Sequence, residues 1–517
     1  MNRAFFVAAG ILLSRLAGLV RLRVFAHYFG LQSDAADAFN AAFRIPNFLQ
    51  NLFGEGALSA SFIPVYAALV SRGERREADR VAGAVGALLA LVIAALVLAG
   101  VFATPLLVAL IAPGFTGDKR ALTIALVRIL FPGAGLLVLS AWCLGVLNSH
   151  GRFLLSYAAP VMWNAAMIAT LVAFGADTPL PRLAALLAWG SVAGSALQFA
   201  VQLPAIVRVA PDARPTLDLV SDHVREVVRN FAPAFVSRGV VQVSAYIDSL
   251  LASLLPTGAV TGLANAQVLY TLPVSLFGMS IAAAELPAMA GERAADRFGA
   301  DAVRTRLNAG LRQIAFFVVP SAMAFLAIGD VIAAALLQTG RFRHEDALYV
   351  WGILAGSALG LLPSTLGRLY SSTYYALRDT RTPLRYAAVH VALATVLGYV
   401  FAIVLPPRLG IPALWGAAGL TASAGIAGWA EMLLLRRTLN RRIGHTGLPA
   451  GYLARLWIAA GSTAGAAWAL KVVMPPLHPV LTALVVLTPY GAVFLACTLA
   501  LGLPEASNAV KPILRRR

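Results

Sequence analysis

The sequence predicts an all-α polytopic membrane protein with about 14 transmembrane helices. Of its 517 residues, 59% are hydrophobic and only 12% are charged, whereas a soluble domain is about half apolar and a quarter charged. The mean hydropathy of +0.78 agrees, and roughly 20 apolar residues suffice for each span. This composition excludes a soluble enzyme, a disordered protein and a disulfide scaffold. It disfavours an outer-membrane barrel, because barrel strands do not form long apolar runs.

Windows without charge place the helices in order along the chain. Such windows include residues 81–117, 153–176, 183–207, 386–407 and 472–504. Turn-forming residues between the apolar runs mark where each helix ends. The predicted spans are 3–29, 36–70, 82–111, 121–148, 153–175, 183–207, 230–255, 259–290, 303–337, 346–377, 384–405, 411–437, 452–473 and 479–503.

The basic residues between these spans predict the orientation in the membrane. The net charge of +18 could suggest nucleic-acid binding, but the Lys and Arg residues lie in short clusters between apolar runs. With a cytoplasmic N-terminus, the inward segments carry 26 basic residues and the outward segments carry seven. Because cytoplasmic loops are enriched in Lys and Arg, we expect both termini to be cytoplasmic and no nucleic-acid partner.

A weak internal repeat predicts two six-helix lobes around a central cavity, plus two C-terminal helices. Ser14 and Arg15 of the first span correspond to Ser237 and Arg238 of the seventh. Such two-fold repeats are common in transporters. The predicted parts are an N-terminal lobe at 1–207, a cytoplasmic linker with an amphipathic helix at 208–229, a C-terminal lobe at 230–440, two further helices at 441–503 and a basic tail at 504–517.

Charged residues inside the predicted spans mark candidate functional positions, because a charge in mid-membrane costs about 2.5–3.5 kcal/mol on insertion scales. Arg15 lies about 17 Å along the first span, near the middle of the bilayer, and we expect it to face a cavity. Arg21 and Arg23 could instead extend to the interface. The second span carries Asp37, Arg44 and Glu55, with Pro46 expected to break the helix; Glu55 could simply pair with an arginine.

In the second half, the isolated charges are Arg238, Asp248, Glu285 and Arg368. Asp330 and Glu431 lie closer to predicted helix ends, and His390 is interpreted as a helix-packing residue. A cavity rich in arginine suits a phosphate or pyrophosphate, which Arg binds in a bidentate manner. The sequence contains no nucleotide-binding loop, metal-ligand cluster or catalytic triad spacing, so we expect a transporter without enzymatic activity, metal or cofactor.

Several motifs resemble the MurJ (MviN) family of lipid II flippases. They are the run from Ser14 to Arg21, followed by Phe29-Gly30, Asp37-Ala38-Phe39, Phe43-Arg44-Ile45-Pro46-Asn47 and Glu55-Gly56-Ala57. Shorter matches occur at 112–115, 147–160, 202–204, 340–342 and 375–383. The resemblance covers about residues 5 to 440.

The resemblance implies the fold of the multidrug/oligosaccharidyl-lipid/polysaccharide exporter superfamily, with a groove for a lipid tail beside the last two helices. It also implies a multi-pass protein of the bacterial inner membrane. The implied activity moves lipid II, the undecaprenyl-pyrophosphate-linked peptidoglycan precursor, from the inner to the outer leaflet by alternating access. The expected partners are lipid II, membrane lipids and cell-wall synthesis proteins. The alternatives are a flippase for another polyprenyl-linked glycan, such as an O-antigen or capsule unit, a drug antiporter and a non-transporting scaffold.

The resemblance also suggests roles for individual residues. Two family arginines are missing, near Gln50 and at Val268, and Arg238 is a candidate replacement for the lost charge. Asp248 matches an aspartate of a family sodium site, but Gly398 stands where an asparagine is common; coupling to sodium or to the membrane potential is therefore left open. The candidate substrate-binding residues are Arg15, Arg21, Asp37, Arg44, Glu55, Arg238 and Arg368, with Asp248 as a possible ion site.

Overall fold

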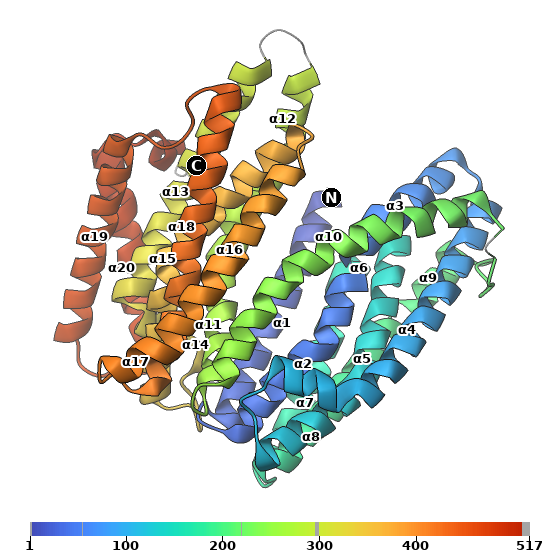
Figure 1. Cartoon of the computed structure of the whole chain (residues 1–517), viewed down its shortest axis with the longest axis horizontal. Coiled ribbons are helices and arrows are strands. Elements are labelled where there is room, and N and C mark those ends of the chain that lie inside the picture. The colour runs from blue at the N-terminus through green and yellow to red at the C-terminus, as the bar shows by residue number, and fades with distance from the viewer. Residues whose placement is uncertain (1–2, 54, 219, 295–298, 509–517) are drawn as a thin grey trace. The chain divides into compact units, whose positions relative to one another are not determined.

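The computed structural model describes the backbone of residues 3–53, 55–218, 220–294 and 299–508, which form helices and connecting loops (Figure 1). Within these ranges the side chains of residues 3–8, 55–56, 232–245, 287–288, 290–294 and 299 are outside the described set, so the predicted roles of Glu55 and Arg238 also fall outside it. By their contacts the helices divide into two units: residues 1–261 with 339–342, and residues 262–338 with 343–517.

Unit 1 contains the helices α1 to α10. Their bounds are α1 Arg3–Phe29, α2 Asp34–Phe53, α3 Glu55–Arg72, α4 Arg75–Ile111, α5 Gly117–Ser149, α6 Phe153–Ala158, α7 Pro160–Phe174, α8 Leu180–Ala200, α9 Leu203–Val209 and α10 Asp222–Ser253. The first residues of α11 also belong to this unit.

Unit 2 contains the remaining helices. Their bounds are α11 Ala259–Pro273, α12 Ser280–Ala294, α13 Gly299–Ala327, α14 Gly329–Leu337, α15 His344–Ala376, α16 Arg381–Tyr399, α17 Leu405–Arg408, α18 Gly416–Ile443, α19 Ala450–Val473 and α20 Pro479–Ala500. Two π-helical turns, η1 Val274–Met279 and η2 Val400–Val404, and a 3₁₀ turn, η3 Ala413–Trp415, lie between them.

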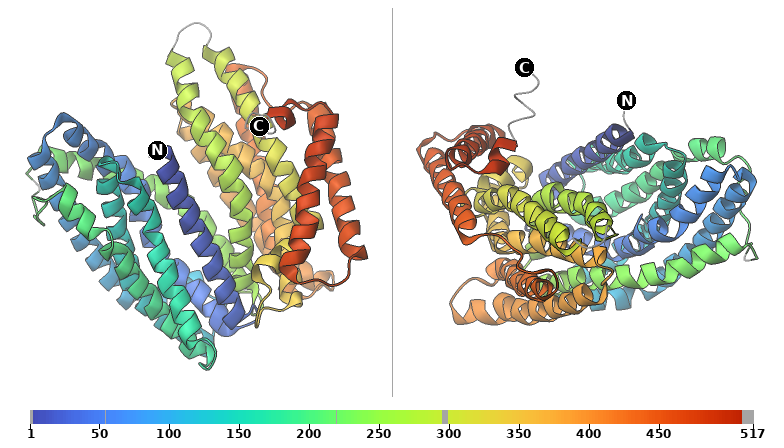
Figure 2. Two further views of the ribbon diagram at one scale, coloured as in Figure 1. Left: turned by 180° about the vertical axis from the view of Figure 1, so that it is seen from behind. Right: turned by 90° about the horizontal axis from the view of Figure 1, so that it is seen from above.

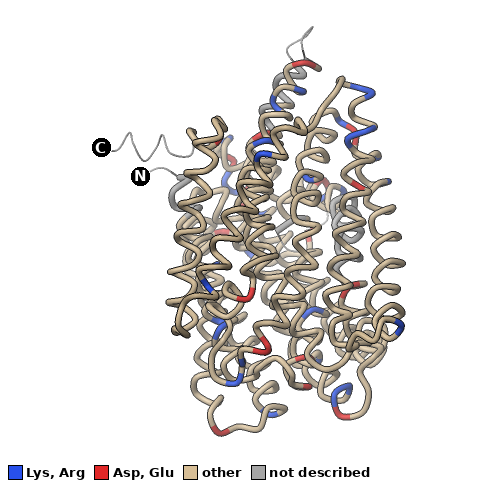
Figure 3. The backbone as a smooth tube through the Cα atoms, turned by 90° about the vertical axis from the view of Figure 1, so that its left-hand side faces the viewer, with Lys and Arg blue, Asp and Glu red and all other residues tan. Residues whose placement is uncertain are grey.

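The all-α membrane fold predicted from the sequence is confirmed. In the described residues, 12 helical segments are long and apolar enough to cross a membrane. The other two predicted spans coincide with α1 and α10, which are helical but include residues with undescribed side chains. The number 14 therefore stays a prediction. Figure 3 shows Lys, Arg, Asp and Glu concentrated toward the helix ends, as expected for helices whose middles face lipid or protein.

Unit 1 packs α2 and α8 against α5, and α7 against both α1 and α8. One of its buried cores includes Phe25, Phe29 and Phe39, and the Phe25 ring packs against the rings of the other two. The prediction that Pro46 breaks the second span is wrong, because α2 continues through Pro46 and ends at Phe53. A proline lacks only one backbone donor, and the buried side chains around it hold the helix together.

The segment before α10 is fastened along the first turns of α4. Arg80 donates to Asp218 at 2.6 Å, and the backbone N–H of Asp212 donates to Asp79 at 3.1 Å. The backbone N–H of Val220 together with the Arg80 guanidinium lowers the pKa of the Asp218 carboxyl. The amphipathic helix predicted near residues 208–229 is the beginning of α10, which continues without a break to Ser253. The predicted lobe boundaries themselves stay predictions.

Unit 2 is organised by the close packing of α15 on α18. A Cβ at Gly360 would lie 2.8 Å from the Cα of Gly425, and a Cβ at Gly425 would lie 2.7 Å from the backbone nitrogen of Gly360. Only glycine permits this approach of two backbones, a common way to pack helices in membranes. The α16 helix covers another part of α18.

The two C-terminal helices pack on α13 and α14 (Figures 1 and 2). The contact includes alanines of α19 and Val486 and Tyr490 of α20, and the Tyr490 hydroxyl donates to the carbonyl of Pro320 at 2.7 Å. Lys471 of α19 also donates to Asp330 of α14, whose carboxylate is only 4% exposed. The pair therefore joins the last helices to the rest of unit 2 electrostatically as well as by apolar contact.

We expect Lys471→Met to lower the thermal unfolding temperature of the detergent-solubilised protein, because Asp330 would be left as a buried charge without its partner. The expected cost is roughly 2–4 kcal/mol. The double variant Lys471→Met with Asp330→Asn is the control and should recover most of the loss. An unchanged unfolding temperature in the single variant would contradict a stabilising role for the pair.

Candidate functional site

Asp37 is the most completely engaged of the predicted site residues. It lies on α2, is only 1% exposed, and its carboxylate accepts four hydrogen bonds. The donors are the backbone N–H of Gly258 at 2.9 Å, the N–H and hydroxyl of Thr261 at 2.9 and 2.7 Å, and Lys119 Nζ at 2.9 Å. Because α11 begins at Ala259, this carboxylate satisfies amide groups that a helix N-terminus leaves unpaired.

Lys119 ties this cluster to a second carboxylate. Its Nζ lies 3.0 Å from Asp34 and 2.9 Å from Asp37, and it stands 4.4 Å from the centre of the Phe115 ring. The Lys119 side chain is 13% exposed, whereas that of Asp34 is 63% exposed. The buried Asp37 contact therefore provides most of the electrostatic gain, since exposed pairs contribute little.

Arg44 and Asp248, predicted for different roles, are neighbours. Arg44 donates to Ser249, the residue after Asp248 on α10, and interacts electrostatically with Asp248 itself. The hydroxyl of Tyr246 donates to the Arg44 carbonyl at 2.8 Å. A guanidinium thus supplies positive charge beside the aspartate that the sequence marked as a possible ion ligand.

Arg21 is held within unit 1 by α7. Its Nε donates to Asn164 Oδ1 at 2.9 Å, and its guanidinium carbon lies 5.0 Å from the Trp163 ring centre. Trp163 in turn stacks on Phe43 at 5.6 Å and donates to Ser191 at 3.1 Å. Arg21 is therefore positioned by specific partners and does not extend freely to the interface.

Arg15 and Arg368 differ from these residues in being exposed within their helices. In the described part of the chain, Arg15 makes no hydrogen bond or ion pair. Arg368 interacts electrostatically with Tyr270, whose hydroxyl shares a 2.7 Å hydrogen bond with Ser364. Each exposed guanidinium retains donors for an anionic ligand.

Val268 and Gln50, the two positions where the resemblance leads us to expect arginine, carry uncharged side chains. Val268 of α11 is 37% exposed. Gln50 of α2 lines a cavity of about 10 Å³ beside Pro46, together with Ser191 and Ser195. Neither position supplies a cation to this structure.

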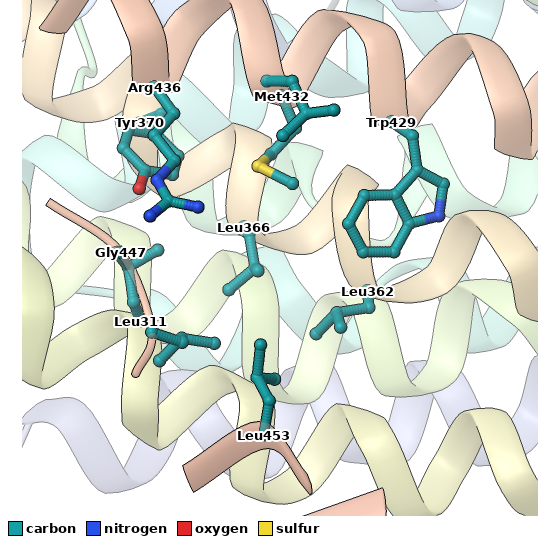
Figure 4. A pocket seen from close by; sticks show the side chains of 11 residues that line it. Leu311, Leu362, Leu366, Tyr370, Trp429, Met432, Arg436, Gly447 and Leu453 are labelled. Atoms are coloured by element: carbon teal, nitrogen blue, oxygen red, sulfur yellow. The ribbon is translucent and has the colours of Figure 1, made fainter. Parts of the chain in front are cut away.

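Unit 2 has an apolar pocket of about 80 Å³ that the sequence analysis does not predict (Figure 4). Arg436 stands at its polar end, where its Nε donates to the Thr446 carbonyl at 2.8 Å. Trp429, Met432 and Arg436 follow one another at helical spacing on α18, and this periodicity could have indicated the pocket. The other lining residues are Leu311, Leu362, Leu366, Tyr370, Leu433, Gly447, Leu448 and Leu453.

Sequence reasoning also missed the partners that hold the predicted residues. Lys119 lies between two predicted spans, and Asn164 and Trp163 lie in the charge-free window 153–176. A lone Asn in such a window is a usable signal, because a buried amide needs a hydrogen-bond partner. Within the described ranges, no three His, Cys, Asp or Glu residues group as a metal site.

Comparison with known proteins places these features in a family context. Residues 25–488 match the family model described as "Lipid II flippase MurJ". The lipid II flippase MurJ of Burkholderia cenocepacia is 32% identical over 448 residues, covering 85% of this chain and 84% of that protein. The probable lipid II flippase MurJ of Vibrio cholerae is 29% identical over 478 residues, covering 90% and 88%.

Solved structures show the same fold. A lipid II flippase MurJ in an inward closed conformation superposes with a TM-score of 0.77 at 23% identity, covering 96% of this chain and 99% of that one. An inward-facing multidrug resistance MATE family transporter of the MOP superfamily gives a TM-score of 0.66 at 16% identity, covering 86% and 100%.

We expect Asp37→Asn to loosen the start of α11, because the amide has one acceptor oxygen and no charge for Lys119. Amide hydrogen exchange at Gly258 and Thr261 should become about tenfold faster, the factor that corresponds to 1.4 kcal/mol. Asp34→Asn is the matched control: it contacts the same Lys119 but is exposed, and its exchange rates should change little. Equal effects of the two variants would contradict a special role for Asp37.

Proposed function

Because this chain belongs to the lipid II flippase MurJ family, we propose that its own cationic and gating residues move lipid II across the bacterial inner membrane. The observation that carries this conclusion is the family match over residues 25–488. The relatives above are named as a lipid II flippase and a probable lipid II flippase, which favours lipid II over another polyprenyl-linked glycan. The chain is a polytopic membrane transporter, and we propose that it catalyses no covalent chemistry of its own.

The orientation that we propose puts both termini in the cytoplasm. It is supported by the 26 basic residues of the inward segments against seven in the outward ones. Lipid II then enters from the inner leaflet and leaves to the outer leaflet by alternating access. Cell-wall synthesis proteins are the partners that we propose for handing over and receiving the precursor.

We assign binding of the pyrophosphate to the arginines. Arg15 and Arg368 are exposed, and Arg21 is held in place by Asn164 and Trp163. Guanidinium groups bind phosphate oxygens in pairs of parallel hydrogen bonds. Arg15 and Arg368 would thus each contact phosphate oxygens directly, while Arg21 adds a fixed positive charge. The lipid tail would follow the apolar surfaces of α19 and α20.

We propose that the Asp37 cluster acts as a latch. Separation of the start of α11 from α2 must break the bonds from Gly258 and Thr261 to Asp37. It must also break the bond from Lys119 of α5 to Thr257. Each hydrogen bond to a charged group contributes about 1.5–3 kcal/mol, so the latch favours one conformation until binding of the substrate offsets that cost. Asp37 is therefore a gating residue in this proposal and does not touch the substrate.

Asp248 does not fit a sodium site in this arrangement, because the Arg44 guanidinium lies beside it and Gly398 offers no side-chain oxygen. We propose the membrane potential as the driving force. With the cytoplasm negative, outward movement of each uncompensated negative charge releases about 2.3 kcal/mol per 100 mV. The membrane potential therefore favours outward movement of the pyrophosphate.

Arg15→Ala and Arg15→Gln should each abolish growth of a bacterium depleted of its own lipid II flippase, with membrane levels of the variant near normal. The Gln side chain keeps hydrogen-bonding polarity and part of the length of the residue but loses the charge that binds the pyrophosphate. Val20→Gln, at an exposed apolar position of the same helix, controls for the polar substitution and should support growth. Full growth with Arg15→Gln at equal expression would exclude the role.

Arg238 is the position we propose to replace the missing arginine at Val268, and a charge relocation tests this. Arg238→Ala should stop complementation, and adding Val268→Arg should restore part of it, since a cation returns to the second half. The competing account is an ion pair with Glu285. That account predicts rescue of Arg238→Ala by Glu285→Gln, and such a rescue without any effect of Val268→Arg would exclude the relocation.

A further inference from the structure

A carboxylate and an imidazole meet inside unit 2, away from the residues assigned above. Glu431 of α18 and His390 of α16 approach to 2.9 Å between Oε2 and Nδ1, and their side chains are 25% and 23% exposed. Both residues lie within helical segments that are long and apolar enough to span the membrane. The pair thus places two titratable groups together where charge is disfavoured.

The position of the pair along its helices points to one side of the membrane. His390 follows Arg385 by five residues, and Glu431 precedes Arg436 by five, so each lies about 7–8 Å inside a band of arginines. The side chains of both residues are partly exposed. Beyond His390 and Glu431, α16 and α18 each continue as an apolar stretch away from the arginines.

The net charge of the Glu431–His390 pair depends on whether the pair holds a proton. One titratable group that interacts with Glu431 is Tyr375 of α15, a phenol that carries no charge while protonated. The cations on the packed helices have other positions or partners: Arg368 is exposed on α15, and Arg436 donates to a backbone carbonyl. The charged groups on the same helices nearest the pair are Arg381 and Arg385 of α16 and Arg436, Arg437, Arg441 and Arg442 of α18.

A contrasting pair shows what a permanent ion pair looks like in the same unit. Glu285 lies 3.6 Å from Arg306, and a guanidinium does not lose its proton in proteins. An imidazole, in contrast, exists in both charged and neutral forms. His390 Nδ1 and Glu285 Oε2 both lack a hydrogen-bond partner in the described residues. The 2.9 Å separation of Glu431 Oε2 and His390 Nδ1 is short enough for a hydrogen bond after a small reorientation of the side chains.

We infer that Glu431 and His390 form a proton-binding site in unit 2 and that its occupancy adjusts the packing of α16 on α18. With one proton the pair is neutral, and we place that proton on the carboxyl group, as a carboxylic acid beside a neutral imidazole, because separated charges are costly in an apolar setting. Loss of that proton to water on the arginine-rich side leaves one negative charge between the helices. No metal or other co-reactant takes part, and one carboxylate with one imidazole offers too few ligands to hold a sodium ion.

The local structure allows α16 to respond. It runs into the π-helical turn η2 at Val400, and such turns often occur where helices bend for function. Gly428, one turn before Glu431, leaves space beside His390, whose Cε1 would lie 3.9 Å from an added Cβ. A change of charge at the pair can therefore be accommodated by a small shift of α16 on α18. That this shift regulates lipid II movement rests on the proposed function.

Infrared titration of the purified protein tests the site independently of transport. The wild type should show the carbonyl band of a protonated carboxyl that grows as the pH is lowered. Glu431→Gln should remove this band, and His390→Asn should move its midpoint, because the imidazole no longer shares the proton. Glu285→Gln is the matched control and should leave the band intact. A wild-type spectrum without such a band, or one unchanged by Glu431→Gln, overturns the site.

Flipping of lipid II in proteoliposomes tests the consequence. With the pH varied only on the arginine-rich side, the wild-type rate should change about fivefold, at the lower end of ordinary coupling free energies. His390→Asn, Glu431→Gln and the double variant should flip at rates independent of pH. If the single variants fail at every pH while the double variant regains the wild-type rate and pH response, the pair is a static structural contact and the proposal is wrong.

The two experiments separate this inference from the proposed function. A wild type that flips no lipid II at any pH contradicts the proposed function, and the infrared band still decides whether the proton site exists. If Glu431→Gln does not fold, as judged by its thermal unfolding, the midpoint shift in His390→Asn decides the question. His390→Gln supplies a second substitution of that residue with the same expected shift.

Discussion

The constraint on which most of this structure depends is the cost of charge in the membrane. A charged group there must find a partner, a hydrated cavity or a proton. Asp37 has Lys119 and the amides at the start of α11, Asp330 has Lys471, and Arg44 has Asp248 nearby. Each of these contacts joins two helices far apart in the chain, so charge compensation also determines which helices meet.

Close backbone contact is the second requirement, because apolar side chains gain little from leaving lipid for a protein interior. Helix association in membranes depends on packing and hydrogen bonds. The glycines Gly360 and Gly425 bring α15 and α18 together at backbone distance, and the same two helices then carry Tyr370, Arg436 and Glu431. The packing of unit 2 thus places its polar side chains as a consequence of small residues elsewhere on the helices.

The residues of the candidate site fall into two kinds, and the difference follows from their partners. Asp37, Arg44 and Arg21 are each held by named neighbours in unit 1, which makes them suited to gating and positioning. Arg15 and Arg368 remain exposed within their helices, where an incoming anion can reach them. An arginine already bound to a carboxylate must give up that partner before it can bind a phosphate, whereas an exposed one loses only water.

The sequence alone determined the membrane fold, the order of its helices and the residues at which charge enters the spans, since hydropathy and charge are properties of local segments. It also carried the family motifs around Asp37 and Arg44. Only the tertiary structure decided which charges are compensated. Lys119 meets Asp37 from 82 positions away, Asn164 meets Arg21 from 143 positions away, and Glu431 meets His390 across two helices. No periodicity encodes these pairings, because they depend on how helices pack, and packing is set by side chains distributed over the whole chain. The continuation of α2 through Pro46 has the same origin: the buried neighbours of the proline, which are distant in sequence, stabilise a helix that its local preference would interrupt.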